Sequence, residues 1–202
     1  LDNEKLKFLP DAIINIKDFL SQKLRSNELS YEKKIILSVG RLTKQKNFIF
    51  YLKWIPEIVK LNKNLYFLFI GQGEDEKIFI ETAKKLKILN NIILIKYTDN
   101  VHYFMKKSKC LILTSLWEDP GFVLVEAGYN NCQVISSNCP NGPNEIISDD
   151  GGYLFKSNDS ESLVNTIKSF YNDSDKSRLS KKVKLKKRLK NFTFFHHSLV
   201  LK

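Results

Sequence analysis

Cysteine and histidine are scarce in this sequence. The three cysteines, Cys110, Cys132 and Cys139, are odd in number and include no CxxC pair. That pattern argues against a disulfide framework and against a zinc site. His102 stands alone and the other two histidines are adjacent near the C-terminus, so the sequence offers no cluster of metal ligands. We expect neither a bound metal nor a cofactor.

Long apolar runs are also absent. The longest, such as 48–52 and 65–70, have the length of core elements and fall short of the roughly 20 residues that span a bilayer. Asp2, Glu4 and Lys5 stand where the apolar part of a signal peptide would lie. The apolar fraction of 43% is ordinary for a globular domain. These features predict a cytoplasmic protein with one well-packed domain.

Acidic residues are outnumbered, with 22 Asp and Glu against 33 Lys and Arg. The excess is concentrated in residues 181–190, where seven of ten residues are basic and none is acidic. Such runs are usually solvated helix faces, which is the interpretation we favour. The alternative is peripheral contact with the inner face of the cytoplasmic membrane. No motif that reads DNA or RNA is present, so nucleic acid is not an expected partner.

Short aliphatic runs alternate with longer amphipathic segments along the chain. Continuous apolar strands alternating with helices are typical of a parallel sheet that is covered on both faces. We therefore predict an α/β fold, a Rossmann-like doubly wound parallel sheet with helices on both faces. The expected strands are 35–39, 66–70, 92–96, 111–114 and 133–136, and the expected helices are 48–61, 75–89, 101–107, 122–129 and 160–171.

Local signals refine the expected boundaries. Asn100 can cap a helix, Ser160 with Glu161 starts another, and Asn90-Asn91 stops one. Pro56 lies inside the expected helix 48–61 and should kink it. The chain divides into an N-terminal segment or linker at 1–33, where residues 13, 16, 19 and 20 could line a helical face, a Rossmann-like domain at 34–172 and a basic C-terminal helix or tail at 173–202.

A cationic loop follows the first expected strand. Gly40 ends the strand, Arg41 follows at once, and Lys46 comes near the next helix start. A guanidinium can bridge a diphosphate and an ammonium can neutralise it, so the spacing lets two cations converge on one anion. Ligands of open parallel sheets bind at such loops, beyond the carboxyl ends of the strands. A solvated basic loop would have the same composition.

Two glutamates follow the fourth expected strand. Glu118 lies in the loop, and Glu126 lies in the helix that Gly121 and Phe122 open. Carboxylates there can accept hydrogen bonds from vicinal sugar hydroxyls, and Gly121 lets a backbone approach a ligand closely. The alternative is a pair of solvated acids. However, Glu126 sits among Val123 and other apolar residues, where an acid needs a partner.

Several segments, taken in order, resemble one known family. They are 38–42 with Lys46, 68–73, 110–127 with both glutamates, 133–137, 139–147 and 151–155. In this order and spacing, from about residue 34 to residue 171, they are similar to the C-terminal domain of the retaining glycosyltransferases of group 1, family 4. The resemblance implies one Rossmann-like half of a GT-B fold.

The resemblance also implies roles for individual residues. Glu118 would hold hydroxyls of the donor sugar and Glu126 the nucleotide ribose, while Arg41 and Lys46 would stabilise the leaving diphosphate. Gly40 and the amides of Gly121, Phe122 and Val123 would contact sugar and phosphates, and the backbone near Tyr97 would read the base. No metal is implied, and UDP-sugars are favoured over GDP-sugars as donors.

The implied function is hexose transfer, with retention, from a nucleotide diphosphate sugar to a glycan or lipid-linked acceptor, in cell-surface polysaccharide or glycolipid synthesis. The sequence departs from the family at Asp119-Pro120, which precedes Gly121. We expect the N-terminal acceptor domain of the family to be missing here, either because this is a fragment of a longer enzyme or because the partner domain is a separate chain. We therefore expect poor transfer by this chain alone. The alternatives are a sugar-nucleotide epimerase or phosphorylase relative and a non-catalytic Rossmann-like binding domain.

Overall fold

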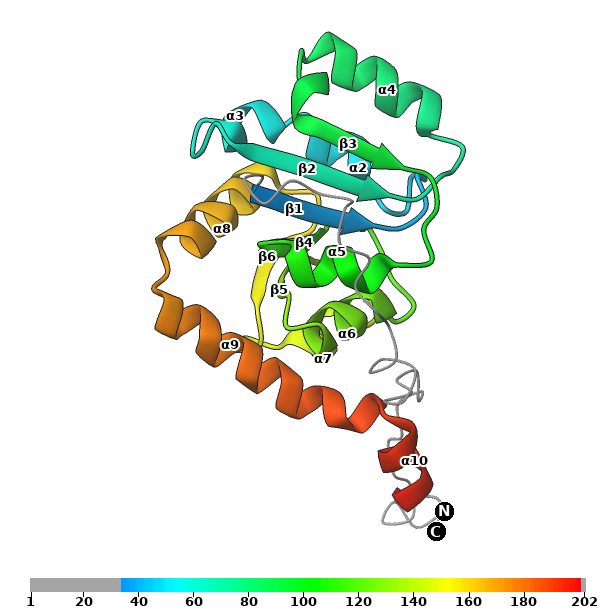
Figure 1. Cartoon of the computed structure of the whole chain (residues 1–202), viewed down its shortest axis with the longest axis vertical. Coiled ribbons are helices and arrows are strands. Elements are labelled where there is room, and N and C mark those ends of the chain that lie inside the picture. The colour runs from blue at the N-terminus through cyan, green and yellow to red at the C-terminus, as the bar shows by residue number, and fades with distance from the viewer. Residues whose placement is uncertain (1–33, 201–202) are drawn as a thin grey trace.

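In the part of the chain that the structure describes, six parallel strands form one sheet. The structure is a computed structural model that describes residues 34–200, without the side chains of Phe195, His197 and Val200. The strand order is β3-β2-β1-β4-β5-β6 (Figure 1). The strands are β1 (Lys34–Val39), β2 (Leu65–Ile70), β3 (Ile92–Ile95), β4 (Cys110–Leu113), β5 (Gln133–Asn138) and β6 (Tyr153–Lys156). The helix expected within 1–33 lies outside the described residues.

Helices cover both faces of this sheet. One layer contains α2 (Phe48–Leu52), α3 (Ile55–Val59), α4 (Glu76–Lys85) and α8 (Ser160–Asn172), and the other contains α5 (Val101–Lys107), α6 (Phe122–Tyr129), α7 (Pro143–Ile147) and α9 (Asp175–Arg188). Ile36 and Phe69 join the core of the first layer, whereas their neighbours Leu37 and Leu68 join that of the second. Successive strand residues point to opposite faces, which explains the continuous apolar runs. The expected doubly wound fold is confirmed.

The strand order reverses between β1 and β4. β2 and β3 follow on one side of β1, while β4, β5 and β6 follow on the other, with Ile36 paired to Cys110 across the junction. At such a switch point the loops after the two central strands diverge to opposite faces and leave a crevice between them. Here those are the loops that follow Val39 and Leu113.

Some expected helix boundaries are wrong. The single helix expected at 48–61 is two short helices, α2 and α3, with Trp54 as the N-cap residue of the second. Pro56 occupies the first turn of α3, where its missing N–H costs no hydrogen bond. The helix expected at 75–89 ends at Lys85, Lys87 has a φ of 58°, and a short 3-10 helix, η2 (Leu89–Asn91), follows.

Of the expected helix starts, one is confirmed and one needs correction. Helix α8 begins at Ser160, as expected, and the Asp159 side chain caps it by accepting a 3.0 Å hydrogen bond from the Ser162 amide. Asn100 precedes α5 but makes no capping hydrogen bond with its side chain. Strand β6 and helix α7 were not expected as elements, although both lie in segments that carry the family resemblance.

The basic helix α9 packs on the domain. Leu185 of α9 is buried against the layer that contains α6. Leu189, which begins the 3-10 helix η3 (Leu189–Phe192), is buried there as well. Arg188 donates a 2.7 Å hydrogen bond to the Ile147 carbonyl, and Gln133 donates a 2.6 Å bond to the Arg178 carbonyl. A last helix, α10 (Phe194–Val200), follows. The domain boundary proposed at 172/173 stays a prediction. None of the described helices is long and apolar enough to cross a membrane.

Candidate functional site

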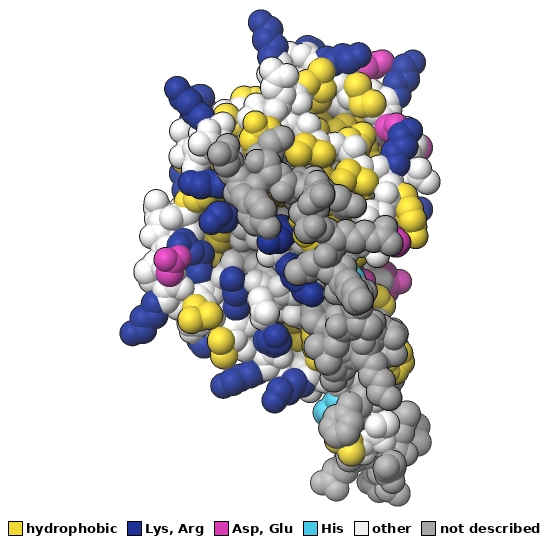
Figure 2. Space-filling model, viewed as in Figure 1, with side chains coloured by type: hydrophobic (Ala, Val, Ile, Leu, Met, Phe, Trp, Pro, Cys, Tyr) yellow, Lys and Arg dark blue, Asp and Glu magenta, His cyan; other side chains and the backbone are white. Residues whose placement is uncertain are grey.

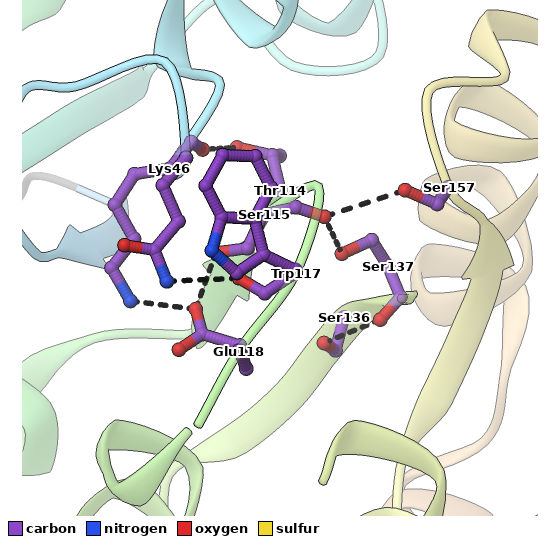
Figure 3. Close-up of polar contacts among 9 residues, drawn as sticks. Lys46, Thr114, Ser115, Trp117, Glu118, Ser136, Ser137 and Ser157 are labelled. Atoms are coloured by element: carbon purple, nitrogen blue, oxygen red, sulfur yellow. Dashed lines mark hydrogen bonds and ion pairs between the residues drawn. The ribbon is translucent and has the colours of Figure 1, made fainter. Parts of the chain in front are cut away.

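The loops after β1 and β4 are joined by hydrogen bonds at the switch point. The Leu116 amide donates to the Gln45 carbonyl at 2.8 Å, and the Thr114 hydroxyl donates to the Lys46 carbonyl at 2.8 Å. The Gln45 side chain donates to the Trp117 carbonyl at 3.1 Å. These hydrogen bonds hold together two loops that are far apart in the sequence, and Lys46 faces Glu118 (Figure 3).

An ion pair joins the two loops at the switch point. Lys46 Nζ is 2.6 Å from Glu118 Oε1, and the two side chains are only 15% and 4% exposed. The Ser115 hydroxyl donates to the same carboxylate oxygen. A charge removed from water needs a partner, so each side chain fixes the position of the other. The structure therefore brings together two of the residues that the sequence singled out.

Two glycines, Gly40 and Gly71, allow close backbone packing next to this ion pair. Gly40 has a φ of 151°, and a Cβ atom there would lie 3.0 Å from Lys46 Cε. Gly71, with a φ of 148°, lies so near that a Cβ atom would overlap the Gly40 carbonyl oxygen. Glycine at both positions lets the loop after β1 and the loop after β2 approach each other, and it leaves room for the methylene groups of Lys46.

Arg41, which follows Gly40 in the sequence, is exposed. Within the described residues its guanidinium makes no ion pair or hydrogen bond to another side chain. It differs in this respect from Lys46, whose ammonium is bound to Glu118. An unpaired guanidinium keeps all its donors available for a planar or diphosphate anion.

Glu126 lies in α6 and is half-buried. Burial raises the pKa of its carboxyl above the ordinary value because a desolvated carboxylate is less favourable than the neutral acid. No side chain in the described part of the chain forms an ion pair with it. A ligand hydroxyl that donated to this carboxylate would supply the missing partner.

The N-terminus of α6 opens directly after Glu118. Gly121 is the N-cap residue with a φ of 89°, and a Cβ atom there would lie 3.3 Å from Glu118 Cγ. The Leu124 amide is the first to bond within the helix, to the Gly121 carbonyl at 3.0 Å. The amides of Phe122 and Val123 precede it in the first turn, where helix N–H groups have no intrahelical acceptor. Such a turn attracts anions.

Asp119-Pro120, the departure from the family pattern, forms a cis peptide bond. The Glu118 amide donates to the Pro140 carbonyl at 3.1 Å, so the loop is anchored on the segment that follows β5. Gly142, in that segment, lies against the Pro120 carbonyl. The altered loop is therefore fixed on two sides.

Tyr97 is not brought to the ion pair. Its side chain is 81% exposed in the loop after β3, and β2 and β1 separate that strand from β4. With strands about 4.8 Å apart, this loop lies roughly 10 Å or more from the switch point. The base-reading role of this segment stays a prediction.

The serines that contact the loop of Glu118 were not predicted from the sequence. The Ser137 hydroxyl donates to the Ser115 carbonyl at 2.7 Å, and the Ser157 hydroxyl approaches the same oxygen at 3.4 Å (Figure 3). These contacts tie the loop after β4 to the end of β5 and the segment after β6. The only signal in the sequence was a pair of hydroxyl residues, Ser136 and Ser137, at a strand end.

Metal-binding side chains do not cluster in the described residues. No three of their His, Cys, Asp or Glu side chains lie close enough to hold one ion. Cys110, Cys132 and Cys139 are buried free thiols, and burial raises the pKa of each. The expectation that no metal takes part stays a prediction.

Comparison with known proteins gives this site a family context. The profile described as Glycosyl transferases group 1 matches residues 21–191. A Campylobacter jejuni protein named N-acetylgalactosamine-N,N'-diacetylbacillosaminyl-diphospho-undecaprenol 4-alpha-N-acetylgalactosaminyltransferase is 28% identical over 166 residues, which cover 82% of this chain and 44% of that protein. An Escherichia coli UDP-Gal:alpha-D-GlcNAc-diphosphoundecaprenol alpha-1,3-galactosyltransferase is 28% identical over 195 residues, covering 90% and 49%.

A solved structure supports the fold. The C-terminal domain of a Francisella tularensis glycosyl transferase group 1 family protein superposes with a TM-score of 0.70 at 19% identity, covering 80% of this chain and 87% of that one. The expected Rossmann-like half of a GT-B fold is confirmed. The chain spans about half the length, or less, of the curated relatives that it matches. By its match over residues 21–191, the chain belongs to the glycosyl transferases group 1 family.

Proposed function

We propose that this chain binds a nucleotide diphosphate sugar and forms the donor half of an enzyme that transfers the hexose, with retention, to a glycan or lipid-linked acceptor. The observation that carries the proposal is the Lys46–Glu118 pair at the switch point. It lies beside the exposed Arg41 and the open first turn of α6. Cations, helix amides and an acceptor of hydroxyl bonds thus surround one crevice.

The cations suit a leaving diphosphate. When the bond between the anomeric carbon and the diphosphate oxygen breaks, its electron pair stays on that oxygen. Lys46 has two more N–H donors beyond the one bound to Glu118, and Arg41 can bridge two oxygens. The amides of Phe122 and Val123 add neutral donors. Charges fixed before the reaction stabilise the developing anion without reorganisation.

The two glutamates suit hydroxyls in different places. Glu118 Oε1 is occupied by Lys46 and Ser115, so its second oxygen is the one available to a hydroxyl of the donor sugar. Glu126, one turn into α6, has no such neighbours and is desolvated. Its two oxygens match the vicinal hydroxyls of a ribose. Different surroundings thus support different roles.

The named relatives support the choice of donor and acceptor. The Escherichia coli protein uses UDP-Gal according to its name, and both curated relatives act on sugars linked to diphospho-undecaprenol. By analogy we propose a UDP-sugar donor, a lipid-linked acceptor in cell-surface polysaccharide or glycolipid synthesis, and action on the cytoplasmic side of the membrane. Because the relatives are about twice as long, we also propose a separate acceptor-binding domain.

Calorimetric titration with UDP and UDP-sugars tests the donor site. We expect saturable binding, and at 100 times the dissociation constant we expect a stabilisation of about 2.7 kcal/mol against unfolding. Glu126→Gln and Arg41→Gln should weaken binding at least tenfold. The matched control Glu81→Gln, on the exposed surface of α4, should bind as the native chain does. No binding by the native chain, or equal loss in the control, would refute the proposal.

A further inference from the structure

The outer face of α9 combines exposed lysines with exposed aliphatic side chains. Lys176, Lys187 and Lys190 are exposed, and Leu179 and Val183 between them are 61% and 47% exposed. With 3.6 residues per turn, the four positions within α9 fall on one side of the helix, and Lys190 follows in η3. The buried Leu185 and Leu189 lie on the opposite side. The side of the helix that faces solvent thus carries both cationic and apolar side chains.

Very little negative charge balances this face. Asp175 is the only acid in α9, and it pairs with Arg178 at 2.6 Å. Lys184 and Arg188, on the flank of the helix, pair with Asp150 at 3.4 and 2.8 Å. Lys176, Lys187 and Lys190 have no ion pair among the described residues. In Figure 2 the dark blue side chains predominate over α9, with apolar patches among them.

The basic character continues past α9 toward the amino ends of the strands. The lining of a cavity of about 470 Å3 there includes Lys34, Lys109, Lys182 and Leu179 of the α9 face, and also Phe170, Tyr171 and the paired Asp175 and Arg178. Lys34 and Lys109 are exposed and stand at the starts of β1 and β4. Cations outnumber the one carboxylate in this lining, which suits a phosphate group, and the cavity borders the apolar strip of α9.

The helix is held rigidly in this orientation. Beyond its buried leucines, α9 is fixed at its start by Arg178, which donates to the Phe170 carbonyl at 2.9 Å. It is fixed at its end by Arg188, bonded to the Ile147 carbonyl. The lysines are therefore presented as one surface, and not as a loose tail.

We propose that this surface, the outer face of α9 with Lys34 and Lys109, docks on an anionic lipid bilayer. Lysines gain energy near negatively charged headgroups, and Leu179 and Val183 can enter the boundary between headgroups and acyl chains. Nucleic acid fits less well, since base stacking needs exposed aromatic side chains, whereas the exposed apolar side chains of α9 are aliphatic and Phe170 in the bordering cavity is buried. Docking involves none of the residues assigned to the donor site, so it stands or falls independently of the proposed function.

Vesicle co-sedimentation tests the surface directly. The 202-residue chain is mixed with vesicles of phosphatidylcholine alone or with phosphatidylglycerol added. We expect binding to the anionic vesicles only, weakened by salt as surface charges are screened. The triple variant Lys176→Gln, Lys187→Gln, Lys190→Gln should bind about a hundredfold more weakly, and the pair Leu179→Gln, Val183→Gln at least tenfold.

A matched triple variant controls for net charge. Lys77, Lys84 and Lys85 are exposed on α4, which belongs to the opposite helix layer, and their change to glutamine should leave vesicle binding unchanged. Circular dichroism should show that all variants fold. Equal loss in both triples, no preference for anionic vesicles, or tighter binding to a single-stranded RNA homopolymer than to vesicles would each overturn the proposal.

Discussion

At the scale of single residues, Lys46 and Glu118 depend on each other. Their side chains are nearly out of contact with solvent and lie 2.6 Å apart. We expect Glu118→Leu to destabilise the chain by about 3 kcal/mol, because it leaves a desolvated ammonium without a partner. Lys46→Met should have a similar effect for the converse reason. Urea unfolding of the single variants measures both.

The double variant Lys46→Met, Glu118→Leu provides the control. Replacing both members of a buried pair by apolar side chains is often close to neutral, so the double variant should be more stable than either single one. Strictly additive losses would contradict the view that the two side chains stabilise each other. Donor binding should be lost in all three variants.

Glu126 gives a prediction about pH. Burial raises the pKa of its carboxyl in the folded chain, so the folded state holds that proton more tightly than the unfolded state does. Stability is therefore lost as pH rises from the unfolded pKa through the folded pKa. Glu126→Gln has no proton to lose. Its Tm relative to the native chain should rise across this window, as measured by calorimetry in a series of buffers.

The exposed Glu81 serves as the comparison for this experiment. Glu81→Gln on α4 should give a Tm difference that does not follow the pattern of Glu126→Gln. A flat Tm difference for Glu126→Gln between acid and neutral pH would show that the carboxyl is solvated in the folded chain. Its assignment as a desolvated ribose ligand would then fail.

The sequence predicted these residues but not their contacts. The strand ends and the rule for parallel sheets indicated which loops to inspect, and Lys46 and Glu118 do meet there. Ser115, which donates to Glu118, was not predicted because a serine in a loop has many possible partners. The position of Arg41 relative to the pair depends on loop conformation, which hydrophobic periodicity does not describe.

At the scale of elements, α9 provides a further test. Leu185 is fully buried against the α6 layer, so we expect Leu185→Ala to destabilise the whole domain by about 2–4 kcal/mol. Leu179→Ala, on the exposed side of the same helix, should change stability by about 0.5 kcal/mol or less. Urea unfolding followed by circular dichroism compares them. Equal, negligible effects would mean that 173–202 is an appendage that does not stabilise the domain.

Element prediction succeeded where burial sets the pattern. Strands β1, β2, β4 and β5 were predicted because central parallel strands are apolar on both faces. Strand β3 lies at the edge of the sheet, but its four residues are all Ile or Leu, so it was predicted as well. Strand β6 was not predicted because it is a short edge strand that ends in the exposed Lys156. Helix α7 has only five residues and begins with Pro143, too little for a helical period. Pro56 was noticed, but whether it kinks one helix or begins a second depends on packing around Trp54.

At the scale of the whole molecule, the site is a product of topology. Lys46 and Glu118 are 72 positions apart, and they meet because β4 pairs with β1 on the side away from β2. Any other placement of β4 would have separated them. The alternation of strands and helices predicted a doubly wound sheet, but it gave no strand order.

The crevice leads to the last prediction. All the residues that we assign bind the donor, and the chain covers 49% of the Escherichia coli relative. Among the residues that the structure describes, none is assigned to orient an acceptor hydroxyl against the anomeric carbon. Positioning of two reactants can account for about 7–11 kcal/mol of a reaction barrier.

We therefore expect this chain to bind nucleotide sugar but to transfer it several orders of magnitude more slowly than a chain extended upstream by an acceptor-binding domain. Transfer of radiolabelled hexose from UDP-sugars to a lipid diphosphate acceptor compares the two at equal donor saturation. Equal rates would mean that catalysis needs only the residues around Lys46 and Glu118, and the two-domain proposal would fail.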